Sequence, residues 1–286
     1  MWIELALLSG LLMGVRRIYE KELTGIFSNF SLGFLQQAFS ILPAAVLLFF
    51  FPMPAALASL PWDFWWPLLI IWLVLYPVQV YFFYRSLREG ELSDVMPMTA
   101  VLPVLNVAVS FVLIGELPTL FGAIGVALVV VGTYFVLLKP DGPRFVRINK
   151  PALFMVFTMA SISIGSTLDK IAIQVSTPVF YSFVNISGVV IVFFVLMFAF
   201  RQHRELKYVR EKFNVLFWLG ILSAISFVAA MTAFSLAPTS YTLAVRTAGF
   251  LVPVAWGILF LKESVSSRKI LALSLITAGI LLLAIQ

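Results

Sequence analysis

The sequence predicts an all-α integral membrane protein, with ten transmembrane helices arranged as two five-helix repeats of inverted topology. Three observations predict this fold. The chain of 286 residues is 62% hydrophobic and only 11% charged, with a mean hydropathy of +1.07, which is far more apolar than a soluble domain. Its apolar runs have the length of membrane helices, and its two halves match at a fixed spacing. A β-barrel would instead show alternating strands of roughly ten residues.

The apolar runs define the expected helices in chain order. A helix needs about 20 residues to cross ~30 Å of hydrocarbon. The first run starts at Trp2 with no basic segment before it, so we expect it to stay in the mature protein as a span and not to be cleaved as a signal peptide. The expected spans are residues 2–23, 30–51, 64–85, 92–114, 118–138, 152–174, 179–200, 214–236, 240–261 and 267–285.

Basic residues predict how these helices are oriented. Of the 19 lysines and arginines, 17 fall at the first, third, fifth, seventh and ninth connections, and Lys170 and Arg246 lie inside spans. Cytoplasmic loops carry the excess of Lys and Arg in membrane proteins. We therefore expect a multi-pass protein of the cell (inner or plasma) membrane with both termini on the extracytoplasmic side.

An internal repeat divides the chain in two. Glu116 ends the fourth expected span in "VLIGELPTLFG", and Glu263 ends the ninth in "ILFLKESVSSRK", 147 residues later. A glycine follows each glutamate by 16 residues, at Gly132 and Gly279. We therefore expect a first five-helix repeat at 1–144 and a second at 145–286, within one transmembrane domain. Since five is odd, the second repeat enters the membrane from the opposite side.

The same comparison pairs charges near the two ends of the membrane. The segment "IYEKEL" corresponds to "TLDKIA", which matches Glu20 and Lys21 with Asp169 and Lys170. Two inverted halves can close one side while opening the other around a fixed site. We assign these four residues as candidate gating or ion-coupling groups, with the two carboxylates as candidate proton carriers.

At these motifs the chain resembles the EamA family of the drug/metabolite transporter superfamily. The resemblance rests on ten spans in two halves, and on Pro103 followed by the Gly-Glu-Leu sequence that ends at Leu117. The second half departs from this pattern, because Lys262 replaces the glycine and Pro253 lies closer to the glutamate. The resemblance implies a secondary transporter or exporter of small metabolites, with a cavity formed by spans 1, 3, 4, 6, 8 and 9. It implies no particular substrate.

Polar side chains recur at helical spacing on five expected spans. Polar groups in hydrocarbon cost several kcal/mol each unless they are satisfied, so they should face the bundle interior or a water-filled cavity. Spacings of three or four residues place them on one face of each helix. The stripes are Ser9, Met13, Arg16 and Glu20; Trp72, Tyr76, Gln79 and Phe83; Thr99, Pro103, Asn106 and Ser110; Met159, Ser163, Ser166 and Lys170; Thr242, Arg246, Gly249 and Pro253.

These stripes give the candidate pathway. For Ser, Thr and Gly the competing interpretation is close helix packing, whereas mixed aromatic and amide groups in mid-span suit a pocket for an organic solute. Pro103 and Pro253, in the middle of matching spans, are candidate hinges because proline removes a helix hydrogen bond. The expected substrate-binding or pathway residues are Arg16, Trp72, Tyr76, Gln79, Thr99, Asn106, Ser163, Ser166 and Arg246.

Arg246 lies seven residues inside its expected span, where a charge costs at least ~2.5 kcal/mol. Asp169 lies near the same membrane face, within reach of it. We expect either an Arg246–Asp169 ion pair, structural or acting as an outer gate, or an arginine that binds an anion. For Arg16, the alternative to a pathway role is that its long side chain snorkels to the inner edge of the membrane.

The sequence carries no enzyme motif of the hydrolase, Walker or zinc types, no cysteine and a single histidine, His203. We expect no enzyme, cofactor or metal. Candidate cations outnumber carboxylates, so we expect a secondary transporter or exporter of a small polar, anionic or zwitterionic, amino-acid-like metabolite. The alternatives are cationic solutes such as choline, amines or drugs held by aromatic rings, and a lipid-handling or receptor-like membrane protein. The expected partners are a small-molecule substrate and the lipid bilayer, without nucleic acid, and the expected state is a monomer.

Overall fold

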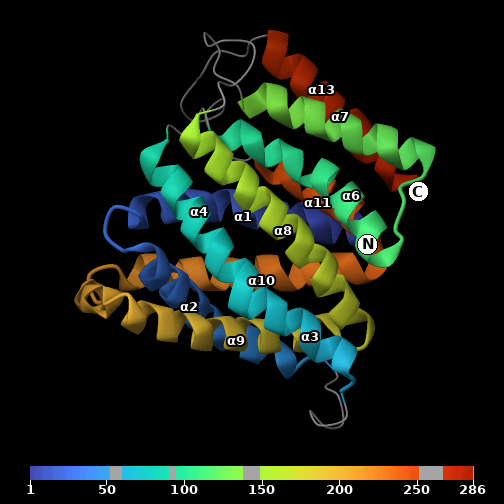
Figure 1. Ribbon diagram of the computed structural model, residues 1–286. Coiled ribbons are helices and arrows are strands. Elements are labelled where there is room, and N and C mark those ends of the chain that lie inside the picture. The colour runs from blue at the N-terminus through green and yellow to red at the C-terminus, as the bar shows by residue number, and fades with distance from the viewer. Residues whose placement is uncertain (52–59, 91–94, 138–148, 251–266, 286) are drawn as a thin grey trace.

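The computed structural model describes residues 1–51, 60–90, 95–137, 149–250 and 267–285. Every regular element within these ranges is a helix, which confirms the all-α prediction (Figure 1). The elements are α1 (Trp2–Leu23), α2 (Asn29–Leu48), α3 (Trp62–Ile70), η2 (Ile71–Leu75), α4 (Tyr76–Glu89), η3 (Met96–Val101), α6 (Leu102–Ile114), α7 (Leu120–Leu137), α8 (Lys150–Gln174), α9 (Pro178–Ala199), η4 (Gln202–Tyr208), α10 (Phe213–Leu236), α11 (Thr239–Thr247), η5 (Ala248–Phe250) and α13 (Ser267–Ala284).

Five helical segments are long and apolar enough to cross a membrane. They are Asn29–Leu48, Trp62–Glu89, Lys150–Gln174, Pro178–Ala199 and Phe213–Leu236, with shorter apolar helices at Met98–Ile114, Leu120–Phe135 and Ile270–Ala284. The helices lie close to the expected spans, because long apolar runs fix where a membrane helix can form. The count of ten spans stays a prediction, since residues 251–266, which hold much of the ninth expected span, lie outside the described residues.

Local signals in the sequence set several helix ends. Asn149 precedes α8, and its side-chain oxygen accepts a hydrogen bond from the backbone N–H of Ala152 at 2.9 Å, as a helix N-cap does. Gly115 ends α6 in the left-handed conformation, with φ of 69°, which glycine adopts without steric cost. Pro103 stands in the first turn of α6, directly after the 3₁₀ helix η3. The predicted hinge thus lies at a junction between two helix types.

The third expected span is one continuous helical segment with a π turn inside it. The turn η2 separates α3 from α4 directly before Pro77, which has no backbone N–H to donate. The hydroxyl of Ser161 on α8 donates to the carbonyl oxygen of Leu75 at 3.0 Å. A neighbouring helix thereby satisfies a carbonyl of the irregular turn.

The helices pack as a central group with one lateral pair. Helix α1 contacts α10, α11 and η5; α2 contacts α9 and α10; and α8 contacts α4, α6 and α3. Helices α7 and α13 lie side by side at one edge (Figure 1). The start of α1 and the end of α13 lie toward the same end of the bundle, opposite η4 (Figure 1).

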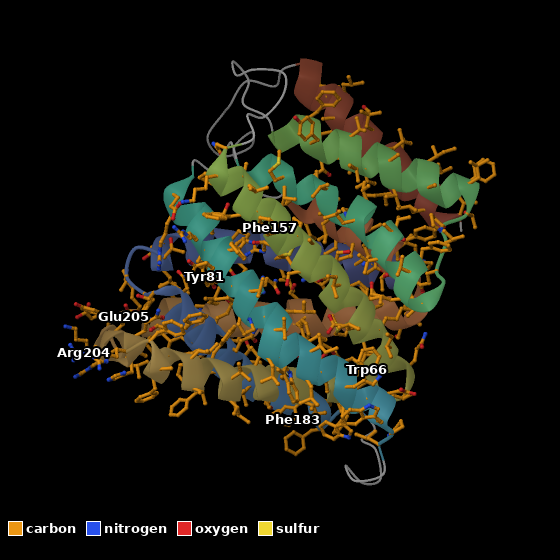
Figure 2. The ribbon with its side chains drawn as sticks, viewed as in Figure 1. Trp66, Tyr81, Phe157, Phe183, Arg204 and Glu205 are labelled. Atoms are coloured by element: carbon orange, nitrogen blue, oxygen red, sulfur yellow. The ribbon has the colours of Figure 1, made fainter. Side chains whose placement is uncertain are left out.

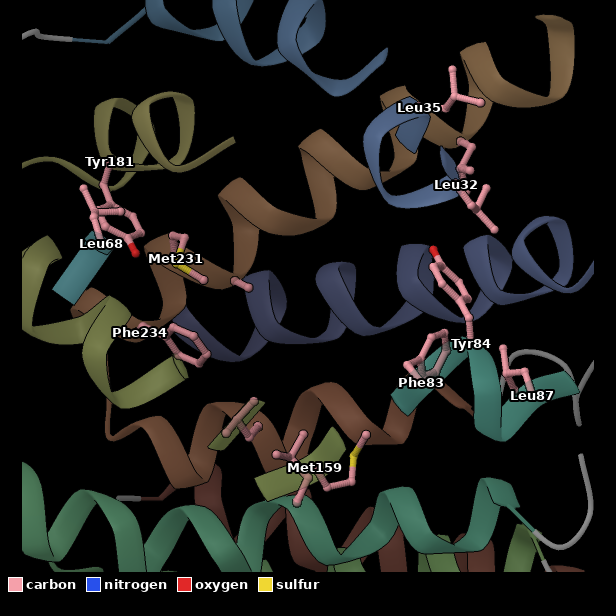
Figure 3. Close-up of a cluster of buried hydrophobic side chains, with 14 of the residues drawn as sticks. Leu32, Leu35, Leu68, Phe83, Tyr84, Leu87, Met159, Tyr181, Met231 and Phe234 are labelled. Carbon is pink, nitrogen blue, oxygen red and sulfur yellow. The ribbon is translucent and has the colours of Figure 1, made fainter. Parts of the chain in front are cut away.

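The main apolar core joins helices from both halves of the chain. Figure 3 shows this cluster, with Leu32, Leu35, Leu68, Phe83, Tyr84, Leu87, Met159, Tyr181, Met231 and Phe234 labelled. Other large apolar side chains cover the outside instead: Val112 is 78% exposed and Ile191 is 66% exposed. Figure 2 shows Phe183 projecting from the perimeter, while Arg204 and Glu205 lie together at the η4 end. An apolar perimeter of this kind is what a lipid-facing surface requires.

Glycines stand where helices cross most closely. A Cβ atom at Gly10 would lie 2.3 Å from the carbonyl oxygen of Arg246, and one at Gly249 would lie 2.0 Å from the carbonyl carbon of Gly10. Gly132 and Gly279, which mark the repeat, lie where α7 crosses α13, and Cβ atoms there would lie 2.8 and 2.7 Å from carbonyl oxygens of the facing helix. Small residues permit this close approach of membrane helices.

Candidate functional site

A cavity of about 160 Å³ lies inside the bundle. Its walls come from both halves of the chain, on α1, α2, α4, α6, α8, α9, α10, α11 and the turns η2 and η3. A buried water needs roughly 10–15 Å³ of such space, so the cavity has room for a small solute or several waters. The predicted residues that line it are Arg16, Tyr76, Gln79, Thr99, Ser166 and Arg246, together with Glu20 and Asp169.

One end of the cavity holds a carboxylate between two arginines. Glu20 is 1% exposed; its carboxylate lies 3.0 Å from Nε of Arg16 and 2.6 Å from a terminal guanidinium nitrogen of Arg17. All three residues are on α1, and Arg16 and Arg17 stand four and three residues before Glu20, spacings at which helical side chains meet. The guanidinium of Arg17 also lies 4.1 Å from the ring centre of Phe83, within cation–π range.

A short chain of neutral hydrogen bonds crosses the bundle near this end. The hydroxyl of Tyr84 on α4 donates to the side-chain oxygen of Gln36 on α2 at 3.1 Å, and the amide nitrogen of Gln36 lies 3.4 Å from the hydroxyl of Ser223 on α10. All three side chains line the cavity. The ring of Tyr84 appears beside Phe83 in Figure 3.

The other end of the cavity holds the second carboxylate among neutral groups. Asp169 on α8 is 8% exposed, and it accepts hydrogen bonds from the hydroxyl of Tyr181 and, at 3.4 Å, from the amide of Asn185. Asn185 also donates to the Tyr181 hydroxyl at 3.0 Å and accepts from the indole N–H of Trp72 at 3.0 Å. Two uncharged donors of α9 thus hold Asp169 of α8, and Trp72 of η2 fixes one of them.

The predicted Arg246–Asp169 ion pair was wrong, because no such pair forms among the described residues. Arg246 lines the cavity instead, and its Nε atom is buried without a hydrogen-bond partner in the described part of the chain. Both residues line the same cavity, but the carboxylate of Asp169 is bound by Tyr181 and Asn185 instead. Close packing of Gly10 against the Arg246 carbonyl fixes α11 at this point.

Lys170 lies outside the cavity, at a junction of helix ends. Its ammonium group pairs with the carboxylate of Glu116. It also donates a hydrogen bond of 2.8 Å to the backbone carbonyl oxygen of Ala237, the residue that caps the C-terminus of α10. The same carboxylate lies 3.3 Å from the backbone nitrogen of Thr239 at the start of α11. The motif glutamate of the first half is therefore bound by the second half.

Asn106 and Ser163 also lie outside the cavity lining, where they join helices. The amide of Asn106 on α6 donates to the Ser163 carbonyl at 3.1 Å and to the hydroxyls of Ser166 and Thr167 at 3.0 and 3.2 Å. Its oxygen accepts from Thr239 at 2.7 Å. These polar residues therefore join α6, α8 and α11 by hydrogen bonds, as the helix-packing interpretation of the polar stripes expects.

The remaining predicted residues fall elsewhere. Trp72 lies against Gly188, where a Cβ atom would be 2.2 Å from the indole ring, and it does not line the cavity. Pro103 lies one residue beyond Leu102, which does line it. Lys21 is in α1, but its side chain lies outside the described atoms, and Pro253 lies outside the described residues.

Two helices that the sequence did not suggest also line the cavity. The expected walls were spans 1, 3, 4, 6, 8 and 9, whereas α2 and α9 contribute as well. The available signals were the adjacent Gln36 and Gln37 within an apolar run, and the i, i+4 spacing of Tyr181 and Asn185. Arg17, one of the candidate pathway cations in the sequence, also lines the cavity beside Arg16.

Comparisons with known proteins agree with this architecture. A solved crystal structure, described only as that of a protein, matches with a TM-score of 0.74 at 16% identity, covering 99% of this chain and 96% of its own. At that identity the likeness shows the fold alone. A search of curated proteins found no match.

The family comparison rests on the first half of the chain. The model of the EamA-like transporter family matches residues 1–138, which contain Glu20, the Gly-Glu-Leu motif and Gly132. Members of this family are multi-pass membrane transporters of the drug/metabolite type and not enzymes. The resemblance found in the sequence is confirmed over residues 1–138, which match the EamA-like transporter family of the drug/metabolite transporter superfamily.

Proposed function

We propose that this transporter moves a small anionic or zwitterionic, amino-acid-like metabolite out of the cell by alternating access, with the cavity as its binding site. The observation that carries the proposal is Arg246. Its guanidinium lines the cavity without a hydrogen-bond partner among the described residues. A guanidinium binds a carboxylate or phosphate through two parallel hydrogen bonds. A solute with such a group would satisfy this buried cation.

The other charges of the cavity support the same class of solute. The described lining residues include three arginines and two carboxylates, and Glu20 is already occupied by Arg16 and Arg17. With both carboxylates ionised, the lining therefore carries one excess positive charge, which favours a solute that presents a carboxylate group. Phe227, Phe234 and Leu243 provide apolar walls, as solute pockets generally have around a few polar groups.

Helix contacts support the two-repeat mechanism. Exchanging the two expected repeats maps the α1–α10 contact onto the α8–α4 contact, and the α1–α11 contact onto the α8–α6 contact; all four contacts are present. The α2–α9 and α7–α13 pairs map onto themselves. A bundle built this way has two arrangements of similar packing, as alternating access requires.

A cationic solute has less support, because arginines outnumber carboxylates in the lining and Trp72, an expected member of the aromatic pocket, does not line it. The indole of Trp72 packs on Gly188 and donates to Asn185. Tyr76 remains in the lining, with its ring edge-on to Phe193 at 6.4 Å between ring centres. Other rings line the cavity as well, at Phe83, Tyr84, Phe193, Phe227 and Phe234, so it is the positive charge of the lining that disfavours a cation.

Thermal stabilisation of the purified protein tests the solute class. Ligands that bind only the folded state raise the unfolding temperature by mass action. Amino acids, organic anions, phosphorylated metabolites and quaternary amines should be compared, and we expect stabilisation by carboxylate-bearing solutes. Stabilisation by quaternary amines alone would overturn the proposal. Absence of flux of every stabilising solute in proteoliposomes would favour the lipid-handling or receptor-like alternative.

Replacing Arg246 with Gln is the sharper test. Loss of a charge-assisted bond of about 1.5–3 kcal/mol should weaken binding of the stabilising solute roughly 10–100-fold, measured by titration calorimetry. Arg204→Gln is the matched control, since Arg204 is exposed on η4 at the end of the bundle. Unchanged affinity in Arg246→Gln would show that the arginine is structural.

A further inference from the structure

The two carboxylates that line the cavity have opposite surroundings. Glu20 contacts two guanidinium groups, at 3.0 and 2.6 Å. Asp169 is held by a tyrosine hydroxyl and an asparagine amide, both neutral. A buried carboxylate that is ion-paired on two sides has its charge compensated, whereas one held by neutral donors lacks a counter-charge of its own. The structure therefore distinguishes a carboxylate that is already occupied by cations from one that is open to a proton or a cation.

Other charged or titratable groups around Asp169 are few in the described part of the chain. Tyr181 faces it from α9, Tyr76 lines the same cavity from α4, and Arg246 lines it from α11. Lys170, its neighbour on α8, is engaged by Glu116. The cavity-lining residues of η3, α6 and α10 carry no charge: they are Thr99, Leu102, Ser223, Phe227, Met231 and Phe234.

The orientation of the Asp169 donors adds a second argument. Tyr181 donates its hydroxyl proton to Asp169, and its oxygen accepts from Asn185. Asn185 is itself fixed by the indole of Trp72 at 3.0 Å. One carboxylate oxygen is thus bound by the α9 residues, through Oδ1. The second oxygen has no hydrogen bond in the described part of the chain, and the residue lines the cavity, where a proton or an ammonium group could reach it.

We propose that Asp169 is the proton-exchange site of the transport cycle, holding a proton when the cavity is empty and the ammonium group of a zwitterionic solute when it is loaded. This rests on the proposed function, with Arg246 binding the carboxylate of the same solute. Binding breaks the O–H bond of the protonated carboxyl group, and water on the open side accepts the proton. The carboxylate then pairs with the ammonium group. Protonation after release restores the empty form.

This exchange makes the transporter a one-for-one proton antiporter. When the zwitterion is bound, the charges of Asp169, Arg246 and the solute sum to zero. When the cavity is empty and Asp169 is protonated, Arg246 leaves the site with one positive charge. Each cycle therefore returns one charge along the membrane potential, which supports a solute gradient of roughly 50-fold per 100 mV. Proton and ammonium compete for one oxygen, so apparent affinity for the zwitterion rises up to about tenfold per pH unit while Asp169 is protonated.

Infrared spectroscopy of the protein in lipid tests the proton site without any solute. Wild-type protein should show the C=O stretch of a protonated carboxyl group that disappears as pH is raised from about 5 to about 9. Asp169→Asn should lack this band, and Glu20→Gln should retain it. If Asp169→Asn does not fold, ¹³C-aspartate labelling of the wild type should shift the band, since the chain has only four aspartates. A band unaffected by both changes, or no band at all, overturns the proposal.

Three matched probes then test the exchange by thermal stabilisation: leucine, 4-methylpentanoate without the amine, and 3-methylbutylamine without the carboxylate. Leucine should stabilise the wild type more at high pH, and 4-methylpentanoate should show no such dependence. The leucine dependence should vanish in Asp169→Asn. A pH dependence that persists in this variant contradicts the exchange. If the Asp169 band is present and leucine does not bind, the solute class of the proposed function fails while the proton site stands.

Discussion

At the scale of single residues, the bundle handles each buried charge differently. Glu20 is compensated within its own helix by Arg16 and Arg17. Lys170 is compensated from the other half of the chain by Glu116. Arg246 has no such partner among the described residues. Because an unpaired charge in a membrane interior is costly, this difference separates structural charges from the one available to a solute.

Removing the Glu20 carboxylate should destabilise the fold. In Glu20→Gln, two guanidinium groups that are only 14% and 18% exposed lose their counter-charge. Breaking a buried pair from one side costs about 3–5 kcal/mol, measured as the free energy of unfolding in detergent. The control is Glu22→Gln, which breaks an exposed pair with Lys212 worth about 0–1 kcal/mol. Equal losses in the two variants would contradict the structural role of Glu20.

At the scale of helices, glycines determine where two helices approach each other most closely. Helix α1 touches α11 and η5 through Gly10 and Gly249, so that backbone lies directly against backbone. Arg246 is in this same contact through its carbonyl. The position of the solute-facing arginine therefore depends on a glycine in the first helix.

Gly10→Ala should consequently affect both stability and binding. The added Cβ atom would lie 2.3 Å from the Arg246 carbonyl oxygen, so the two helices must separate. Overpacking of this kind costs about 1–3 kcal/mol, and solute affinity should fall with it, as measured by thermal unfolding and by calorimetry. Gly25→Ala is the control, since its Cβ would meet only a carbonyl oxygen at 3.7 Å. Wild-type behaviour of Gly10→Ala would show that α1 and α11 are not held at this distance.

At the scale of the whole molecule, both ends of the chain lie toward one end of the bundle and η4 toward the other (Figure 1). The distribution of basic residues predicts that the η4 end is cytoplasmic. The chain contains no cysteine, so single cysteines report accessibility without background.

Lys207→Cys, exposed on η4, should react with a membrane-impermeant maleimide only in inverted membrane vesicles. Asp63→Cys, exposed at the start of α3, should react only in intact cells. Both variants change exposed residues and should leave transport unchanged. The opposite labelling pattern would reverse the predicted orientation, and labelling of both from one side would contradict the odd number of spans between them.

The sequence predicts helices better than it predicts contacts, and the reason is geometric. Apolar length fixes where a membrane helix lies and the rise per residue fixes the depth of each side chain. That was enough to place Arg16, Glu20, Thr99 and Arg246 in one cavity. Rotation of each helix about its axis depends on packing against several others, so the partners of Asp169 and Lys170 could not be derived from depth alone. Gln36 and Tyr181 were missed because each of their helices carries only one short polar signal and not the four-residue stripes of the other spans.

The contacts of Lys170 also bear on the timing of transport. One ammonium group bonds to the motif glutamate of the first half and to the end of α10, and that glutamate reaches the start of α11. Because the two halves of the chain supply the opposite charges of this pair, separation at this end leaves both charges without a partner, which is costly in a membrane. We therefore expect this ion pair to slow opening at this end of the bundle.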